Sequence, residues 1–149
     1  MKYILISVLI IGIIALIIKK NSINNFNSNN NIMEQKQENL KNEKIKSYSM
    51  LKCMYDDGYF PKHLVDKSKA ILIDLCYQIE ATQPKSLDEL YKLSQEATRK
   101  FNYLDDEFLE NDSEIETGAR ECIAENFDYI SKAYGYDADI EELIATRNW

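Results

Sequence analysis

Two acids, two tyrosines and the chain's one histidine occur together in the stretch "MYDDGYFPKHL", residues 54–64. Asp56 and Asp57 precede His63, with Tyr59 between them. A carboxylate beside an imidazole can move protons as a general acid–base pair. A single histidine near a helix start is more often a surface or capping residue. We therefore interpret the stretch as a corner between two helices, and keep these four residues as the lesser of two candidate sites.

Most other catalytic and cofactor motifs are excluded by the sequence. One histidine rules out the metal sites that need two, among them H-E-x-x-H and paired E-x-x-H motifs. Neither G-x-x-x-x-G-K-[ST] nor G-x-G-x-x-G occurs, so no glycine-rich phosphate cradle is encoded. No G-x-S-x-G elbow presents a nucleophilic serine. We therefore predict no catalytic residue, no metal site and no cofactor.

The strongest charge feature is the acidic run "DDEFLENDSEIE", residues 105–116. Residues 101–149 hold 14 acidic and 3 basic residues, in a chain with a net charge of −7. An EF-hand alignment would place Ile115 at a ligand position, so a calcium loop is not predicted. Such a field repels nucleic acid and attracts basic proteins. The expected partner-binding residues are Asp105, Asp106, Glu107, Glu110, Asp112, Glu114 and Glu116.

Helical periodicity runs through the second part of the chain. Apolar residues recur at three- and four-residue spacing over 45–55, 64–79, 87–108, 115–130 and 140–144. Capping boxes are expected where Ser86 precedes Glu89 and where Ser113 precedes Glu116. Asp137 is the expected cap of the last helix. The sequence thus predicts an all-α domain, a compact bundle of about five helices.

Glycine and proline mark the expected helix ends. Gly135 is placed to end the helix over 115–130, and Gly58 to end the first helix with a positive φ. Pro61 suits the first turn of the helix that follows. Between them, Tyr59 and Phe60 are expected to cover an open end of the bundle.

The N-terminus carries a membrane signal. Residues 3–18, "YILISVLIIGIIALII", form an uncharged apolar run flanked by Lys2, Lys19 and Lys20. This length is at the short end for a transmembrane helix, and flanking lysines extend it. A cleaved signal peptide is the alternative, although the residues after the run make a poor cleavage site. We expect a transmembrane anchor over 1–20, an asparagine-rich disordered linker over 21–44, and the helical domain over 45–149.

The lysines and cysteines indicate on which side of the membrane the helical domain lies. Lys19 and Lys20 outnumber Lys2, which favours a cytoplasmic location for the domain. The three cysteines, Cys53, Cys76 and Cys122, lie far apart and cannot all pair within one chain. Reduced, buried thiols are therefore expected, as is usual in the cytoplasm.

Four blocks of sequence carry a family resemblance. The blocks "MLKCMYDDGYFPKHLVDK", "LDELYKLSQEAT", "SEIETGARECIAENFDYI" and "YGYDADIEELIATRNW" together resemble an uncharacterised bacterial family of small acidic all-helical proteins. The resemblance covers residues 45–149. It implies a helical domain of unknown function and brings no activity or catalytic residue with it.

Three classes of function remain after these exclusions. The first is a membrane-tethered, non-enzymatic module whose acidic surface binds a basic protein, either as an immunity-type inhibitor or as an adaptor. The alternatives are a structural membrane protein and an enzyme that uses carboxylates with Mg²⁺. The sequence does not fix the oligomeric state.

Overall fold

The computed structural model describes residues 33–149, and within them every regular element is helical. Residues Gln35–Trp149 form one compact unit. Its labelled helices are α2 (Glu43–Lys46), α3 (Lys52–Asp56), α4 (Lys62–Thr82), α5 (Leu87–Leu109), α6 (Thr117–Ala133) and α7 (Ile140–Leu143). A further helical segment covers residues 33–38. The all-α prediction is confirmed for this part of the chain, with more helices than the five expected.

Two predicted helix ends are confirmed in detail. The Ser86 hydroxyl accepts a hydrogen bond from the Glu89 N–H at 3.3 Å and caps α5. Gly135 follows α6 with φ +89°. Its N–H donates to the Lys132 carbonyl, and the Tyr136 N–H donates to the Ser131 carbonyl at 2.9 Å. This pair of bonds is the Schellman motif, which glycine favours because it lacks a Cβ.

Two other predicted caps are wrong. The N-cap of α6 is Glu116, without a side-chain hydrogen bond, and Ser113 lies buried before it. Asp139, and not Asp137, caps α7, since its carboxylate accepts from the Glu141 N–H at 2.8 Å. Both helices begin later than predicted, α6 at Thr117 and α7 at Ile140, so Ser113 and Asp137 lie too far before them to be the N-cap.

The apolar stripe over 45–55 does not form one helix. The chain breaks between α2 and α3, and Leu51 takes a left-handed conformation with φ +54°. The buried Gln37 amide donates to the carbonyls of Ile45 at 2.8 Å and Tyr48 at 2.7 Å. The Leu51 N–H donates to the Asn126 side chain at 3.0 Å. These distant side chains replace the hydrogen bonds that a continuous helix would have made.

The packed unit begins before the boundary expected at residue 45. Gln37 and Leu40, both in the expected linker, are 4% and 1% exposed. The Tyr77 hydroxyl, from α4, donates to the Lys36 carbonyl at 2.7 Å. The residues just before α2 are therefore part of the folded domain.

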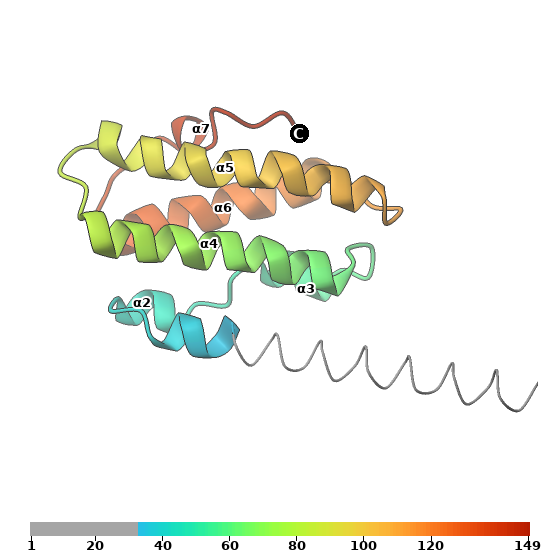
Figure 1. Ribbon diagram of the computed structural model, residues 1–149, viewed down its shortest axis with the longest axis horizontal. Helices are drawn as coiled ribbons and strands as arrows, with labels where there is room; N and C mark the ends of the chain where they lie inside the picture. The colour runs from blue at the N-terminus through green and yellow to red at the C-terminus, as the bar shows by residue number, and fades with distance from the viewer. Residues whose placement is uncertain (1–32) are drawn as a thin grey trace, which may run out of the picture. The chain divides into compact units, whose positions relative to one another are not determined.

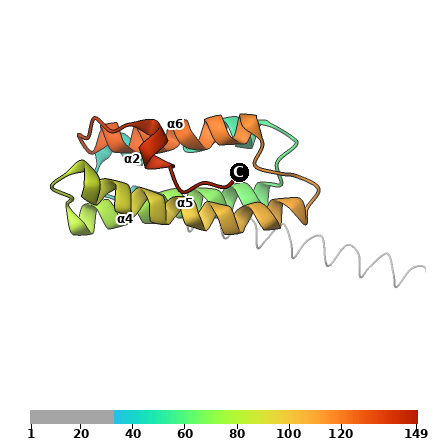
Figure 2. The same ribbon diagram turned by 90° about the horizontal axis from the view of Figure 1, so that it is seen from above.

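Helices α4 and α5 lie side by side in antiparallel orientation, joined by a short turn (Figure 1). Helix α6 lies in a second layer against α4, and α7 contacts both α5 and α6 (Figure 2). Helices α2 and α3 each contact α6, and α3 also contacts α4. The short connections make neighbouring helices pack against each other, as in other helical bundles.

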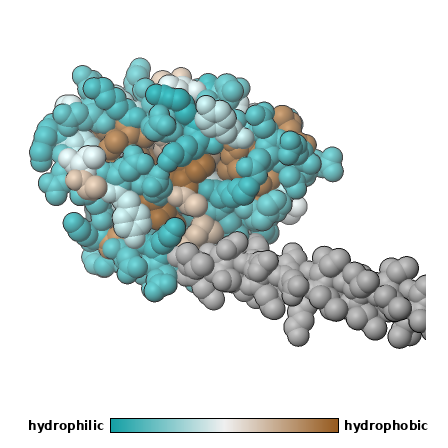
Figure 3. Space-filling view, viewed as in Figure 1, coloured by the Kyte–Doolittle hydropathy of each residue, from teal (hydrophilic) through white to brown (hydrophobic). Residues whose placement is uncertain are grey.

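Aromatic side chains occupy the centre of the unit. Phe101 of α5 lies 6.0 Å from Phe127 of α6 and 6.3 Å from Trp149, measured between ring centroids. At the C-terminal end of α5, Phe108 meets Phe60 edge to face at 6.3 Å. All four phenylalanines are almost fully buried. The face seen in Figure 3 is mostly hydrophilic, with separate apolar spots between polar side chains.

The predicted membrane span, 3–18, and the asparagine-rich tract after it lie outside the described residues. Across residues 33–149, no helix combines the length and the apolar character needed to cross a bilayer.

Candidate functional site

Two of the seven acids predicted to bind a partner are used within the domain. The half-buried Asp105 carboxylate accepts a hydrogen bond from the Ile115 N–H at 3.0 Å and holds the turn between α5 and α6 closed. Glu107 forms an ion pair with Lys67, which ties α5 to α4. The charge of Glu107 is paired with a lysine, so it adds little to an acidic surface, whereas Asp105 keeps its charge but is half-buried at the turn.

The other five acids form an exposed group, which we call the acidic end. Each side chain in it is exposed, and none forms an ion pair with a described residue. Asp112 stands in the turn with φ +55°, a conformation that aspartate tolerates better than most residues. The acidic end consists of Asp106, Glu110, Asp112, Glu114 and Glu116.

Two large apolar side chains stand beside the acidic end. Tyr103 is 75% exposed and Leu109 is 55% exposed, both on α5. Tyr103, Asp106 and Glu110 follow one another at helical spacing, so they lie along one face of α5. Tyrosine is enriched at the centres of protein interfaces. Exposed apolar side chains therefore lie beside unpaired charge at this end of α5.

The residues of the second candidate site do not meet as a catalytic pair. Asp56 forms an ion pair with Lys52, and Asp57 accepts a hydrogen bond from the Tyr59 N–H at 2.9 Å. His63 is exposed and bonds with neither carboxylate. Asp56 is thus paired within α3 and Asp57 is bonded within the turn that follows, which agrees with a corner between α3 and α4.

Details of this corner differ from expectation. Gly58 does not take a positive φ. Pro61 stands one position earlier than predicted, as the N-cap of α4. Phe60 is buried as expected, but Tyr59 is 43% exposed. Asp57 closes the turn with its own side chain, which removes the need for a left-handed glycine.

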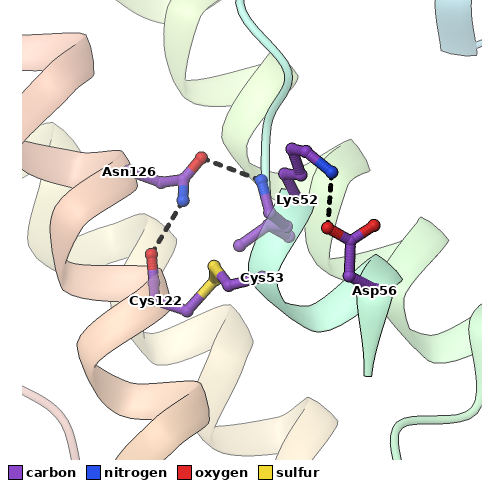
Figure 4. Close-up of a disulfide and its surroundings, with 6 residues drawn as sticks. Lys52, Cys53, Asp56, Cys122 and Asn126 are labelled. Atoms are coloured by element: carbon purple, nitrogen blue, oxygen red, sulfur yellow. Dashed lines mark hydrogen bonds and ion pairs between the residues drawn. A yellow bond between two sulfur atoms is a disulfide. The ribbon is translucent and has the colours of Figure 1, made fainter. Parts of the chain in front are cut away.

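The expectation of three reduced thiols is wrong. Cys53 of α3 and Cys122 of α6 form a disulfide with a Cα–Cα distance of 6.2 Å (Figure 4). Only Cys76 is free, and it is buried. Burial raises the pKa of the Cys76 thiol to about 12. The residues that pair are 69 positions apart, and sequence spacing does not reveal such a pair.

The side chain of Asn126 also helps to hold the start of α3 against α6, beside the disulfide. Its side chain accepts from the Leu51 N–H and donates to the Cys122 carbonyl at 2.7 Å (Figure 4). The disulfide and Asn126 together fix the start of α3 on α6.

The described part of the chain contains no set of ligands for a metal ion. No group of three or more His, Cys, Asp or Glu side chains between residues 33 and 149 is placed to hold an ion. The acids of the acidic end project from a helix end and a loop and do not converge. The alternative of a Mg²⁺-dependent enzyme gains no support from this geometry.

Sequence reasoning missed a cleft near the C-terminal end of α4. It has a volume of about 340 Å³ and is lined by Glu80, Tyr134 and Tyr136 among others. The Tyr134 hydroxyl donates to Glu80 Oε1 at 2.8 Å. Nothing in the sequence marks Glu80, because its partners come from segments that are distant along the chain.

The domain is an all-α unit with an acidic helix end, a disulfide and, among its described residues, no cluster of side chains placed to hold a metal ion. The family model described as "Family of unknown function (DUF5713)" matches residues 44–149. The chain belongs to this family. No curated protein and no solved structure matches it.

Proposed function

We propose that this protein is a membrane-attached, non-enzymatic module that binds a basic protein through the acidic end. The observation that carries the proposal is the set of five exposed carboxylates around the α5–α6 turn, none of them neutralised by a described basic residue. Concentrated charge of one sign raises the association rate of an oppositely charged partner.

The exposed apolar side chains support the same surface. Tyr103 and Leu109 supply contact area that can be desolvated when a partner covers them. The carboxylates at the rim then select a basic partner, while the tyrosine and leucine contribute most of the affinity.

We propose that residues 3–18 attach the protein to the membrane, because they have the composition of a membrane anchor. Two features predict opposite sides for the domain. Lys19 and Lys20 favour the cytoplasm, whereas the Cys53–Cys122 disulfide favours an oxidising compartment. Labelling of thiols in intact cells with a membrane-impermeant reagent, before and after reduction, decides between them.

Affinity separates the two forms of the proposed module. An immunity-type inhibitor is expected to bind its target among the tightest known complexes, with a Kd down to about 10⁻¹³ M or below. An adaptor is expected to bind far more weakly and to exchange partners.

The test is affinity purification of the tagged full-length chain from its own cells, with mass spectrometry. One bait is the native chain. A second carries amides at the acidic end: Asp106→Asn, Glu110→Gln, Asp112→Asn, Glu114→Gln and Glu116→Gln. We expect one stoichiometric basic protein on the native bait and its loss from the second.

A matched control removes the same charge elsewhere. It carries amides at five exposed acids that form no described ion pair: Glu38, Glu121, Glu125, Asp137 and Glu142. This variant is expected to keep the partner, because the net charge falls equally while the acidic end is intact. Absence of any partner, or retention by the acidic-end variant, contradicts the proposed function.

A further inference from the structure

The cleft near the C-terminal end of α4 differs from the acidic end in position and chemistry. Since α4 and α5 are antiparallel, Glu80 lies at the opposite end of this pair from the acidic end (Figure 1). The volume of about 340 Å³ is at the lower end of the range for small-ligand sites, about 300–1,000 Å³. The walls combine one carboxylate, two tyrosine rings and the apolar side chain of Ile79.

Glu80 is held in place by neutral donors only. Its Oε1 accepts from the backbone N–H of Asn42 at 3.1 Å, from that of Lys41 at 2.8 Å, and from the Tyr134 hydroxyl at 2.8 Å. Its Oε2 accepts from the Lys41 N–H at 3.0 Å. No described Lys, Arg or His side chain forms an ion pair with Glu80. The negative charge is therefore fixed in position and not neutralised.

The acceptor capacity of Glu80 is unevenly used. A carboxylate offers about four lone-pair sites on its two oxygens. Oε1 takes three donors, whereas Oε2 takes one. Oε2 thus has capacity for a further N–H donor.

The two tyrosines are held by their hydroxyls. Tyr134 donates to Glu80, and Tyr136 donates to the Pro84 carbonyl at 2.8 Å. The Tyr134 phenol is protonated at neutral pH, and burial raises its pKa further above the ordinary value of 10. With both hydroxyls engaged, the rings are fixed surfaces against which a planar cation can stack.

We propose that this cleft is a binding site for a guanidinium group, paired with Glu80 Oε2 and stacked against the rings of Tyr134 and Tyr136. Guanidinium fits better than ammonium because it is planar and more weakly hydrated and stacks on aromatic faces. Two sources share this chemistry, an arginine side chain of a polypeptide and a free small guanidine.

Lys41 allows an independent test of whether the ligand of the cleft is a cation. Its side chain is exposed at the cleft and forms no ion pair with a described residue, while its backbone N–H donates to Glu80. Its positive charge repels a cationic ligand. Substitution of the side chain removes this repulsion and leaves the backbone hydrogen bond in place.

The experiment is NMR titration of ¹⁵N-labelled full-length protein in micelles. The reporters are the Lys41 and Asn42 amides, because both donate to Glu80. The probes are N-acetyl-arginine-N-methylamide, agmatine and the uncharged isostere N-acetyl-citrulline-N-methylamide. We expect saturable shifts with both guanidines and none with the citrulline probe. Tighter binding of the arginine amide indicates a polypeptide source, and tighter binding of agmatine a small molecule.

Two variants complete the test. Glu80→Gln is expected to weaken guanidine binding about tenfold, since a charge-assisted hydrogen bond is lost. Lys41→Gln is expected to strengthen it about two- to fivefold. If Glu80→Gln disturbs the local fold, the Lys41 variant still decides. Equal binding of the citrulline probe, or affinity for guanidines that Lys41→Gln leaves unchanged, overturns the proposal.

Discussion

Reduction of the Cys53–Cys122 disulfide is expected to lower the free energy of unfolding by about 4 kcal/mol. The bridge closes a loop of 69 residues in the unfolded chain. In the chain-entropy relation, closing a loop of this length removes conformational entropy from the unfolded chain. At 25 °C this raises the free energy of the unfolded state by about 4 kcal/mol. That is a large part of the roughly 5–15 kcal/mol that stabilises an ordinary domain.

Because of where the bridge lies, its reduction is expected to lower the stability of the whole domain. Cys53 lies on a five-residue helix, α3, which is too short to be stable by itself. Cys122 is buried in α6. Without the bond, α3 is held on α6 by packing and by the Asn126 hydrogen bond to Leu51. A loss of about 4 kcal/mol corresponds to a melting temperature lower by roughly 15 °C.

The assay is urea denaturation of the full-length protein, with and without a phosphine reductant, followed by circular dichroism. Cys53→Ser serves as the bridge-free variant, and it should unfold at the same urea concentration in both conditions. Cys76→Ala is the matched control, because it removes a cysteine that is outside the bridge. Reductant should shift the midpoint of the Cys76→Ala variant as much as that of the native chain.

Mass spectrometry of alkylated thiols provides the necessary check. It should count one reactive thiol in the denatured oxidised chain and three in the reduced chain. If three thiols are counted and the midpoint does not move, the bridge adds no stability and the entropic reasoning is refuted.

Three further predictions concern packing, capping and pH. Phe108→Ala should lower the free energy of unfolding by about 3–5 kcal/mol in urea denaturation, because the ring is fully buried against Phe60; a loss below 1 kcal/mol would show that the site collapses without cost. Ser86→Ala should cost about 1 kcal/mol, whereas Ser86→Asp should be nearly neutral, since aspartate also accepts from the Glu89 N–H. Stability should fall as pH rises from 9 towards 12, by up to about 1.4 kcal/mol per pH unit, because the Cys76 thiol ionises near 9 when unfolded and near 12 when folded. The Cys76→Ala variant should show a flatter dependence between pH 9 and 10, and an unchanged slope would contradict this assignment.

The helices that carry the bundle could be predicted from local pattern. Residues 64–79, 87–108 and 115–130 show helical periodicity and coincide with most of α4, α5 and α6. Ser86 and Gly135 act through hydrogen bonds within a few residues of their own positions. Such signals are complete in the sequence, because every group involved lies close along the chain.

The candidate site was only partly predictable. The concentration of acids over 105–116 is visible in composition, but their division into structural and exposed members is not. Asp105 meets the Ile115 N–H, and Glu107 meets Lys67 of another helix. Only the packing of α5 on α4 and the path of the following turn decide which carboxylates remain unpaired.

The sequence by itself determined the all-α class, the long helices and the excess of acid in the last third of the chain. Tertiary structure decided the break between α2 and α3, the Cys53–Cys122 pair and the position of Glu80 in a cleft. These three features depend on contacts between residues far apart in sequence. Gln37 and Asn126 bond to the backbone around the break, and a disulfide joins α3 to α6. The Lys41 and Asn42 amides bond to Glu80 of α4. A helix forms from its neighbours along the chain, whereas a pairing or a cleft exists only after distant segments have packed.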